Sequence, residues 1–396
     1  MSDNRPPATH PLNDMGGVTP TNFQNYPHSA WGFYHARHLH PFASVSRGPG
    51  PVTEFVNNFQ DIGSIAFDAQ GHHRMTIAKM LETQYTHGFI VVHRGEIALE
   101  HYGYGMSPSD THILMSTTKS FAGSLAGILV YQGSLDESAL VTDVLPDLKD
   151  SAYKGAKVRD LLDMRVGLDF SEDYEDPHSD FAYLDAACGW RPRIAPDAPD
   201  NLFDFILSMR PGPPHGGAFH YVSANSVVLG WVMETVTGVR FADLLSTYIW
   251  QPMRAEQDAD LILDPCGRSQ TEGGLNVTLR DLARFGELHR LNGSMHGQQI
   301  VPSQWIEDLH ENGDAEAWNN GLMSERLPGH HYRSQWYVHR EHPRRPYFTL
   351  GAFGQILYVD PVAELVMAKL SCHAYGDDFN TVLPAYRAIA DAFSPS

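Results

Sequence analysis

The order of strand-like and helix-like segments is the feature that most constrains the fold of this chain. Two strand-like runs in "GFIVVHRGEIALEHYGYG" meet at Arg94-Gly95, which is a hairpin signal. Strand-like runs return late, in "YFTLGAFGQILYVD" and "ELVMAKLSC", with Asp360-Pro361 at the turn between them. The middle of the chain instead carries apolar residues at helical spacing. An antiparallel sheet built from both chain ends is therefore the simplest arrangement.

We accordingly predict an α+β fold, in which that sheet is flanked by helices and a mostly helical domain is inserted. The 396 residues suffice for one large domain or two of ordinary size. The sheet domain is expected to comprise residues 1–140 and 271–396, and the inserted domain residues 141–270. Residues 1–70, rich in Pro, Gly, Asn and His, are expected to form an extended arm over the body. A cleft between the two parts is the expected site.

Two helices can be placed from local signals. The run "TTKSFAGSLAGILVYQGSLD" has apolar residues at helical spacing, and Gly133 is placed to cap its C-terminus. Its many Ala, Gly and Ser residues allow close packing on all sides, so this helix is expected to be central and buried. "VTLRDLARFGELHRLNG" is an amphipathic helix with Thr278 as its expected N-cap.

Charge and cysteine content narrow the class of protein. The formal net charge is -19, which disfavours nucleic-acid binding because phosphates need clustered Lys and Arg. The charge serves solubility or attracts cationic small molecules. Cys188, Cys266 and Cys372 show no paired spacing, which fits a reducing compartment. With no signal-peptide pattern and no long apolar stretch, we expect a soluble cytoplasmic protein without membrane contact.

The segment "LMSTTKSFAG" places Ser116 and Lys119 three residues apart, on one face of the expected buried helix. Ser116 lies where the helix begins, so its N–H at the positive end of the dipole could stabilise an oxyanion. A desolvated lysine has a lowered pKa, and its neutral amine can take the serine proton. The alternative is an ordinary helix start with a surface lysine.

The spacing alone is weak evidence, because Ser151 and Lys154 repeat it in a polar run without an apolar helix behind it. Two further elements strengthen the case for Ser116. Tyr221, in "FHYVSAN", precedes a helix, and a phenol near a neutral lysine can relay a proton to a leaving group. The Gly-bounded segment "LGAFGQILYVDP" could supply a second oxyanion N–H.

These three elements, in this order, resemble the serine β-lactamase and penicillin-recognising family. Nearly the whole chain takes part, through "WGFYHARHLHPFASVSR", "LMSTTKS", "EDYEDP", "CGWR", "FHYVSAN", "EGGLNVTLRDLARFG" and "LGAFGQILYVDP". The nearest branch is that of the 6-aminohexanoate-dimer hydrolases and related carboxylesterases. The resemblance implies a β-lactamase/DD-peptidase-like fold. It also implies Ser116 as acylated nucleophile, Lys119 as general base, Tyr221 as proton relay, and the N–H groups of Ser116 and Ala352 as oxyanion hole.

The same resemblance implies residues that bind the substrate. By their positions in the family's motifs, Tyr174 contacts the scissile region, Asp185 meets an ammonium end and Trp190 lines the pocket. Three further positions are expected to contact substrate: Ser223, Glu272 and Phe353. Glu272 could equally be a solvated surface residue with no role in binding. The acidic run that ends at Asp185 is typical of a solvated loop.

Two departures from the family pattern bear on specificity. The second element reads Tyr221-Val222-Ser223 in place of Tyr-x-Asn, which favours the branch of the 6-aminohexanoate-dimer hydrolases. The third reads Ala352-Phe353-Gly354 in place of Lys-Thr-Gly or His-x-Gly. The missing cation disfavours substrates with a penicillin-like carboxylate and leaves room for neutral or cationic substrates. It also makes ester cleavage a safer expectation than amide cleavage.

Other functions that the sequence could suggest lack their motifs. The histidines around His38 lack H-E-x-x-H and a carboxylate at ligand spacing, so we expect no metal. There is no G-x-S-x-G elbow and no phosphate-binding Gly-rich loop, so we expect no cofactor. An acyltransferase with the same acyl-enzyme, a β-lactamase or DD-peptidase-like activity, and a non-catalytic ligand-binding relative stay open. The expected partner is a small ester or amide, and a homodimer is the assembly to test.

Overall fold

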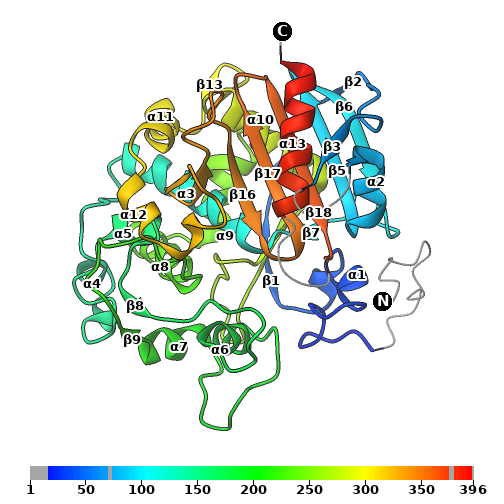
Figure 1. Cartoon of the computed structure of the whole chain (residues 1–396). Coiled ribbons are helices and arrows are strands. Elements are labelled where there is room, and N and C mark those ends of the chain that lie inside the picture. Colours follow the sequence, from blue (N-terminus) through cyan, green and yellow to red (C-terminus); the bar gives the residue numbers. More distant parts are fainter. Residues whose placement is uncertain (1–16, 70–73, 374–378, 395–396) are drawn as a thin grey trace.

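The centre of the molecule is an eight-stranded sheet, seen in a computed structural model that describes residues 17–69, 74–373 and 379–394 (Figure 1). In spatial order its strands are β14 (His331–Arg333), β15 (Trp336–Val338), β16 (Tyr347–Gly351), β17 (Gln355–Asp360), β18 (Leu365–Ser371), β5 (Thr86–His93), β6 (Glu96–Tyr102) and β2 (Val56–Asn57). The strands from β14 to β6 pair antiparallel, and β2 joins β6 in parallel. The two chain ends meet where β18 pairs with β5, which confirms the predicted sheet.

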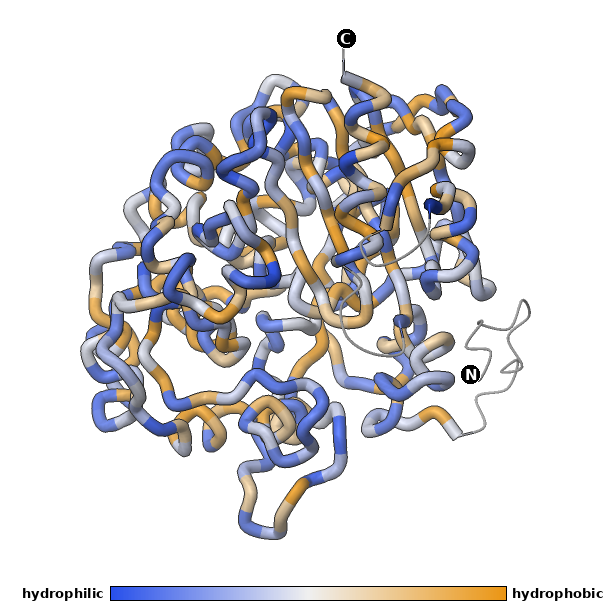
Figure 2. Tube along the Cα trace, in the orientation of Figure 1, coloured by the Kyte–Doolittle hydropathy of each residue, from blue (hydrophilic) through white to orange (hydrophobic). Residues whose placement is uncertain are grey.

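Helices cover both faces of this sheet. Helix α10 (Leu279–Arg290) packs on one face, and α13 (Phe379–Phe393), red in Figure 1, lies over the other. Side chains of β18 alternate between the two cores: Val366 packs with the α10 residues and Met367 with those of α13. A strand that is covered on both faces needs apolar residues on both, which explains its unbroken run. Figure 2 shows hydrophobic stretches along these central strands.

The region between the two sheet-forming parts is mostly helical, as expected. Helix α3 (Thr118–Tyr131) precedes this region. The helices within it are α4 (Val141–Val144), α5 (Val158–Leu162), α6 (Asp180–Ala187), α7 (Leu202–Ser208), α8 (Ala224–Thr237) and α9 (Phe241–Leu245), followed by a π-helical turn (Ser246–Trp250). The same region also holds the short strand pair β8 (Leu168–Asp169) and β9 (Arg210–Pro211). The shorter elements elsewhere are α1 (Ser29–Gly32), α2 (Ile77–Thr83), α11 (Ser303–Glu311), α12 (Ala315–Asn319), β3 (Ala66–Asp68) with β4 (Arg74–Thr76), and β12 (Ser294–Met295) with β13 (Gln298–Gln299). The division into two domains stays a prediction.

The N-terminal arm is more structured than the sequence suggested. Residues 1–16 lie outside the described part of the chain. Strand β1 (Phe42–Val45) pairs with β10 (Ala259–Ile262) in a second sheet, which continues through β11 (Leu275–Val277) to β7 (His112–Ile113). The arm therefore contributes a strand to this sheet and, through β2, another to the main sheet. The arm forms strands because it pairs with segments that are distant in the chain, and the local sequence does not indicate such pairing.

The local signals hold where they were strongest. Arg94 and Gly95 both have positive φ, 54° and 80°, as a two-residue hairpin turn requires. Gly133 has φ 73° and follows Gln132, the C-cap residue of α3, and α3 is buried along nearly its whole length. The Thr278 hydroxyl accepts a hydrogen bond from the Asp281 N–H at 3.1 Å and so caps α10. In the described ranges, no helix is long and apolar enough to cross a bilayer.

The turn between β14 and β15 is buried against the helical region. Ser334 and Gln335 have φ of 48° and 69°. The Ser120 hydroxyl of α3 donates to the Gln335 carbonyl at 2.6 Å, and the Gln335 side chain donates to the Leu161 carbonyl of α5 at 2.9 Å. Gly123 faces this turn so closely that an added Cβ would lie 2.1 Å from the Ser334 carbonyl oxygen. The turn thus fills the space between α3 and α5.

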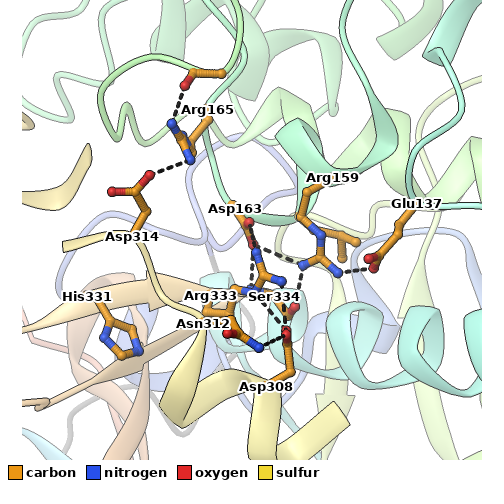
Figure 3. A network of polar contacts seen from close by, with 12 residues as sticks. Glu137, Arg159, Asp163, Arg165, Asp308, Asn312, Asp314, His331, Arg333 and Ser334 are labelled. Carbon is orange, nitrogen blue, oxygen red and sulfur yellow. Dashed lines mark hydrogen bonds and ion pairs between the residues drawn. The ribbon is translucent and has the colours of Figure 1, made fainter. Parts of the chain in front are cut away.

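An ion-pair network fixes the same turn from the outside, as Figure 3 shows. Asp163, which follows α5, accepts from Arg333 at 2.6 Å, from Arg159 at 3.2 Å and from the Ser334 N–H at 2.9 Å. Arg333 also bonds Asp308 of α11 at 2.7 Å. A partly buried charge that loses its partner destabilises the fold. The network therefore holds the helical region against the edge of the sheet.

Candidate active site

The nucleophile candidate lies in a strained turn that leads into α3. Ser116 is the middle residue of a 3₁₀ turn, Met115–Thr117, directly before Thr118. Met115 is buried with φ 48°, a conformation that costs a non-glycine residue about 1 kcal/mol. The Thr117 and Thr349 hydroxyls bond each other at 2.8 Å and fasten this turn to β16. Backbone strain that its surroundings hold in place is frequent at functional sites.

Lys119 lies one turn into α3, with 1% of the residue exposed. Its Nζ donates to Ser116 Oγ at 2.7 Å and to the Glu272 carbonyl oxygen at 2.6 Å. Burial lowers the pKa of Lys119 to about 8, although the nearby Glu172 and Glu272 carboxylates oppose this shift. A nearly dehydrated amine of lowered pKa in contact with a serine hydroxyl is equipped to act as a base.

Tyr221 completes the predicted group. Its ring lies 5.2 Å from Lys119 Nζ, measured to the ring centroid, and its hydroxyl is hydrogen-bonded with Ser116. Burial raises the pKa of Tyr221 above its ordinary value, so the phenol keeps its proton at neutral pH. The structure therefore brings together the three side chains that the sequence singled out. The other Ser-x-x-Lys pair behaves differently, because the Ser151 hydroxyl donates to the Leu148 carbonyl instead.

A cavity of about 440 Å³ opens above Ser116. All the residues expected to bind substrate line it, together with the expected second oxyanion residue: Tyr174, Asp185, Trp190, Ser223, Glu272, Ala352 and Phe353. Ala352 and Phe353 form the turn between β16 and β17, where Phe353 has φ 64°. Ala352 thus borders the cavity at the end of the strand that Thr349 fastens to the nucleophile turn.

Asp185, the residue expected to meet an ammonium end, lines the cavity but is already paired with a cation of the chain. Its residue is 2% exposed, and its Oδ2 accepts from Arg191 Nη2 at 3.0 Å and from Gln24 at 3.4 Å. Burial raises the pKa of Asp185 to about 6, while Arg191 opposes the shift. An ion pair with Arg191 already balances the carboxylate. The partner was visible in the sequence, because Arg191 directly follows Trp190 in "CGWRPR".

Glu172 is the residue that sequence reasoning missed most clearly. It lies in the acidic run that reads as a solvated loop, yet it is half-buried. Its carboxylate accepts from the Ser223 N–H at 2.9 Å, from the Ser223 hydroxyl and from the Tyr174 hydroxyl at 3.2 Å. The Ser223 hydroxyl is therefore engaged by Glu172, and Tyr174, 48% exposed, is tethered at the cavity rim. No local pattern distinguishes Glu172 from its acidic neighbours.

The N-terminal arm and α6 supply further lining that the sequence did not indicate. Gln24, Asn25 and Tyr26 of the arm border the cavity, as does Cys188 at the end of α6. The Cys188 thiol donates to Glu272 Oε1 at 3.2 Å, and Glu272 is buried, so the solvated reading of this glutamate is wrong. Among the described residues, no three His, Cys, Asp or Glu side chains gather as a metal site.

Known proteins with similar sequence or structure share this architecture. A family model described as Beta-lactamase matches residues 76–392. The 6-aminohexanoate-dimer hydrolase of Paenarthrobacter ureafaciens is 35% identical over 366 residues, which cover 92% of this chain and 91% of that protein. A solved structure from Bacillus anthracis that carries the same hydrolase name superposes with a TM-score of 0.89 at 26% identity, over 97% of this chain and 99% of that one. EstCE1, described as a hydrolase with promiscuous acyltransferase activity, shares the fold at a TM-score of 0.60 and 16% identity, over 80% of this chain and 96% of its own.

Proposed function

We propose that this chain, which belongs to the β-lactamase family and is a serine hydrolase, cleaves carboxylic esters and linear amides through an acyl-enzyme on Ser116. The family membership rests on the matched family model and on the 35% identity over most of the chain. The single observation that best supports the proposed chemistry is the contact of a buried Lys119 Nζ with Ser116 Oγ at 2.7 Å.

The proposed reaction begins with the neutral Lys119 amine, which accepts the hydroxyl proton of Ser116 as Oγ attacks the substrate carbonyl. The N–H groups of Ser116 and Ala352 stabilise the negative oxygen of the tetrahedral intermediate. Tyr221 then passes a proton to the leaving alkoxide or amine, taking one from the Lys119 ammonium, and the carbon–leaving group bond breaks. Water attacks the resulting ester, gives its proton to the same base and releases the acid and free Ser116.

Esters are better supported as substrates than amides, because the two leaving groups differ in their need for a proton. An alkoxide leaves with little help, whereas an amine must be protonated as it departs, which places the whole demand on Tyr221. The cavity holds no side-chain cation beyond Arg191 among its lining residues, and that guanidinium is paired with Asp185. A penicillin-like carboxylate therefore lacks a free cationic partner there, and we rank β-lactamase or DD-peptidase-like activity below ester hydrolysis.

The test is hydrolysis of a short p-nitrophenyl ester by the wild type, Ser116→Ala and the matched control Ser151→Ala, which removes the serine of the other Ser-x-x-Lys pair. Loss of at least about 1,000-fold in Ser116→Ala, with Ser151→Ala like wild type, is expected. Labelling by a serine-directed phosphonate should be lost in the same variant. Equal activity of Ser116→Ala and wild type would refute the proposal. Product analysis with an added alcohol measures any acyl transfer.

A further inference from the structure

One aromatic side chain of the cavity is held in a backbone conformation that costs free energy. Phe353 has φ 64°, in the left-handed region that a bulky residue adopts only as an outlier. Its ring is half-buried and lines the cavity, and the residue directly follows Ala352, the proposed second oxyanion residue. Backbone strain of this kind clusters at ligand-binding and catalytic sites, where the surrounding structure maintains it.

The contacts that hold Phe353 leave part of its ring facing the cavity. Phe33 of the N-terminal arm is fully buried and packs edge-on against this ring, with 5.1 Å between the ring centroids and 61° between the planes. The Phe353 carbonyl accepts a hydrogen bond from the His373 N–H at 3.0 Å. Backbone and one side of the ring are thereby fixed, while the half-buried remainder is apolar surface that a ligand can cover.

A second aromatic ring lies on the same side of the cavity. Tyr26 of the arm lines the cavity, and its ring centroid is 5.3 Å from that of Tyr85. The Tyr85 ring contacts the His373 ring at 5.1 Å, and His373 is the residue that bonds the Phe353 carbonyl. This series of contacts brings the arm next to the turn between β16 and β17.

Charge is distributed unevenly around the cavity. The lining residues that the arm and this turn supply are uncharged: Gln24, Asn25, Tyr26, Ala352 and Phe353. Among the described residues, the charged lining side chains come from other segments: Glu175, Asp185, Arg191 and Glu272. The side of the cavity next to Ala352 therefore suits an uncharged group of the substrate.

The chemistry of the Phe353 ring favours an aromatic group over a saturated one. Aromatic pairs in edge-to-face or offset contact gain free energy beyond that of the apolar area they bury, because the positive edge of one ring meets the negative face of the other. A saturated ring of similar size fills the same volume without this term. The third sequence element, Ala352-Phe353-Gly354, also departs from the family's usual Lys-Thr-Gly, so the phenyl ring is a feature of this chain.

We propose that Phe353 selects esters that carry an uncharged aromatic ring one methylene group away from the scissile ester, in the acyl group or in the alcohol. This inference rests on the function proposed above, because it names the substrate class of the same site. In that function the Ala352 N–H holds the carbonyl oxygen. Phe353 is the next residue, so a ring in contact with it lies close to the bond that breaks.

The experiment compares substrates that differ in whether the ring is aromatic. Methyl phenylacetate and methyl cyclohexylacetate carry the ring in the acyl group, whereas benzyl acetate and cyclohexylmethyl acetate carry it in the alcohol. The methylene group insulates the ester from the ring, so the two members of a pair have similar intrinsic reactivity. The readout is the ratio of kcat/KM, aromatic over saturated, within each pair. This ratio cancels losses of activity or folding that are common to both substrates.

In Phe353→Leu this ratio should fall about 3- to 10-fold in at least one pair, the value of one aromatic contact. The pair that responds identifies the acyl or the alcohol side. Phe353→Tyr keeps the ring and should retain the wild-type ratio within about twofold. Phe181→Leu is the matched control, because it removes another cavity-lining ring, from α6, and should shift the ratio less than about twofold.

Three results would overturn the inference. The first is an unchanged ratio in both pairs with Phe353→Leu. The second is an equal fall with Phe181→Leu, and the third is a fall with Phe353→Tyr as large as that with Phe353→Leu.

Binding separates this inference from the proposed function. On a Ser116→Ala background, NMR titrations with the same esters give the ratio of Kd within each pair, and Phe353→Leu should change it by the same factor of about 3 to 10. If the wild type hydrolyses none of the esters but this ratio still depends on Phe353, the proposed function fails and the aromatic subsite stands. If the esters are cleaved and neither readout responds to Phe353, the inference fails alone.

Discussion

Acidification below pH 8 should remove the base and with it the activity. An ordinary lysine with a pKa of 10.5 would leave about one amine in 3,000 neutral at pH 7, whereas a pKa of about 8 leaves about one in ten. Burial of Lys119 thus supplies about 300-fold more active base at neutral pH. The expected profile of kcat/KM is flat above about pH 9 and falls tenfold per pH unit below about 7.

Stopped assays with a neutral benzyl ester measure this profile without an indicator that itself titrates. A second variant tests the assignment, because the Glu272 carboxylate raises the pKa of Lys119 by its charge. Its removal in Glu272→Gln should lower that pKa and move the acid limb to lower pH. A wild-type profile that stays flat down to pH 6, or a limb that moves upward in Glu272→Gln, would show that Lys119 is not the group that titrates.

Three further perturbations address the frame of the site. Gly123→Ala should destabilise the protein by at least about 2 kcal/mol in urea unfolding, because its Cβ would lie 2.1 Å from the Ser334 carbonyl oxygen. Gly133→Ala, with φ 73° and open space, is the control and should cost about 1 kcal/mol; equal losses would contradict the packing argument. Asp163→Asn should cost about 3 kcal/mol, since it removes the buried carboxylate charge that Arg333, Arg159 and the Ser334 N–H share, and a loss below 1 kcal/mol would show that the network is solvated. Glu172→Gln should lower kcat on a neutral ester about tenfold by loosening its hydrogen bonds, and an unaltered kcat would leave Glu172 a tether only.

Local sequence signals predicted the parts of this fold that local physics decides. Arg94-Gly95 gave the hairpin, Thr278 the helix start and Gly133 the helix end, because each position needs a particular residue type. The contact of Ser116 with Lys119 follows from helical periodicity in the same way. The spacing could not establish the burial of Lys119, which depends on strands and helices distant in the chain.

The remainder of the site depends on tertiary contacts that no short segment contains. Glu172 belongs to the site because Ser223, 51 residues later, folds against it. Arg191 pairs with Asp185 because the chain turns back after the end of α6, and the sequence did not predict this turn. Gln24 reaches the cavity because the arm continues into a strand of the second sheet. In each case the residue type was visible, and its partner was not.

The buried turn at Ser334 and Gln335 has a consequence for synthesis of the chain. Ser120 finds its acceptor 215 residues later, and β5 pairs with β18 across a comparable stretch. While the ribosome is still making the last quarter of the protein, α3 therefore lacks the cover that shields its small-residue face. Folding dominated by such distant pairings is slow and leaves apolar surface open to aggregation. The helix that follows Ser116 is thus open to chaperones until the C-terminal strands arrive.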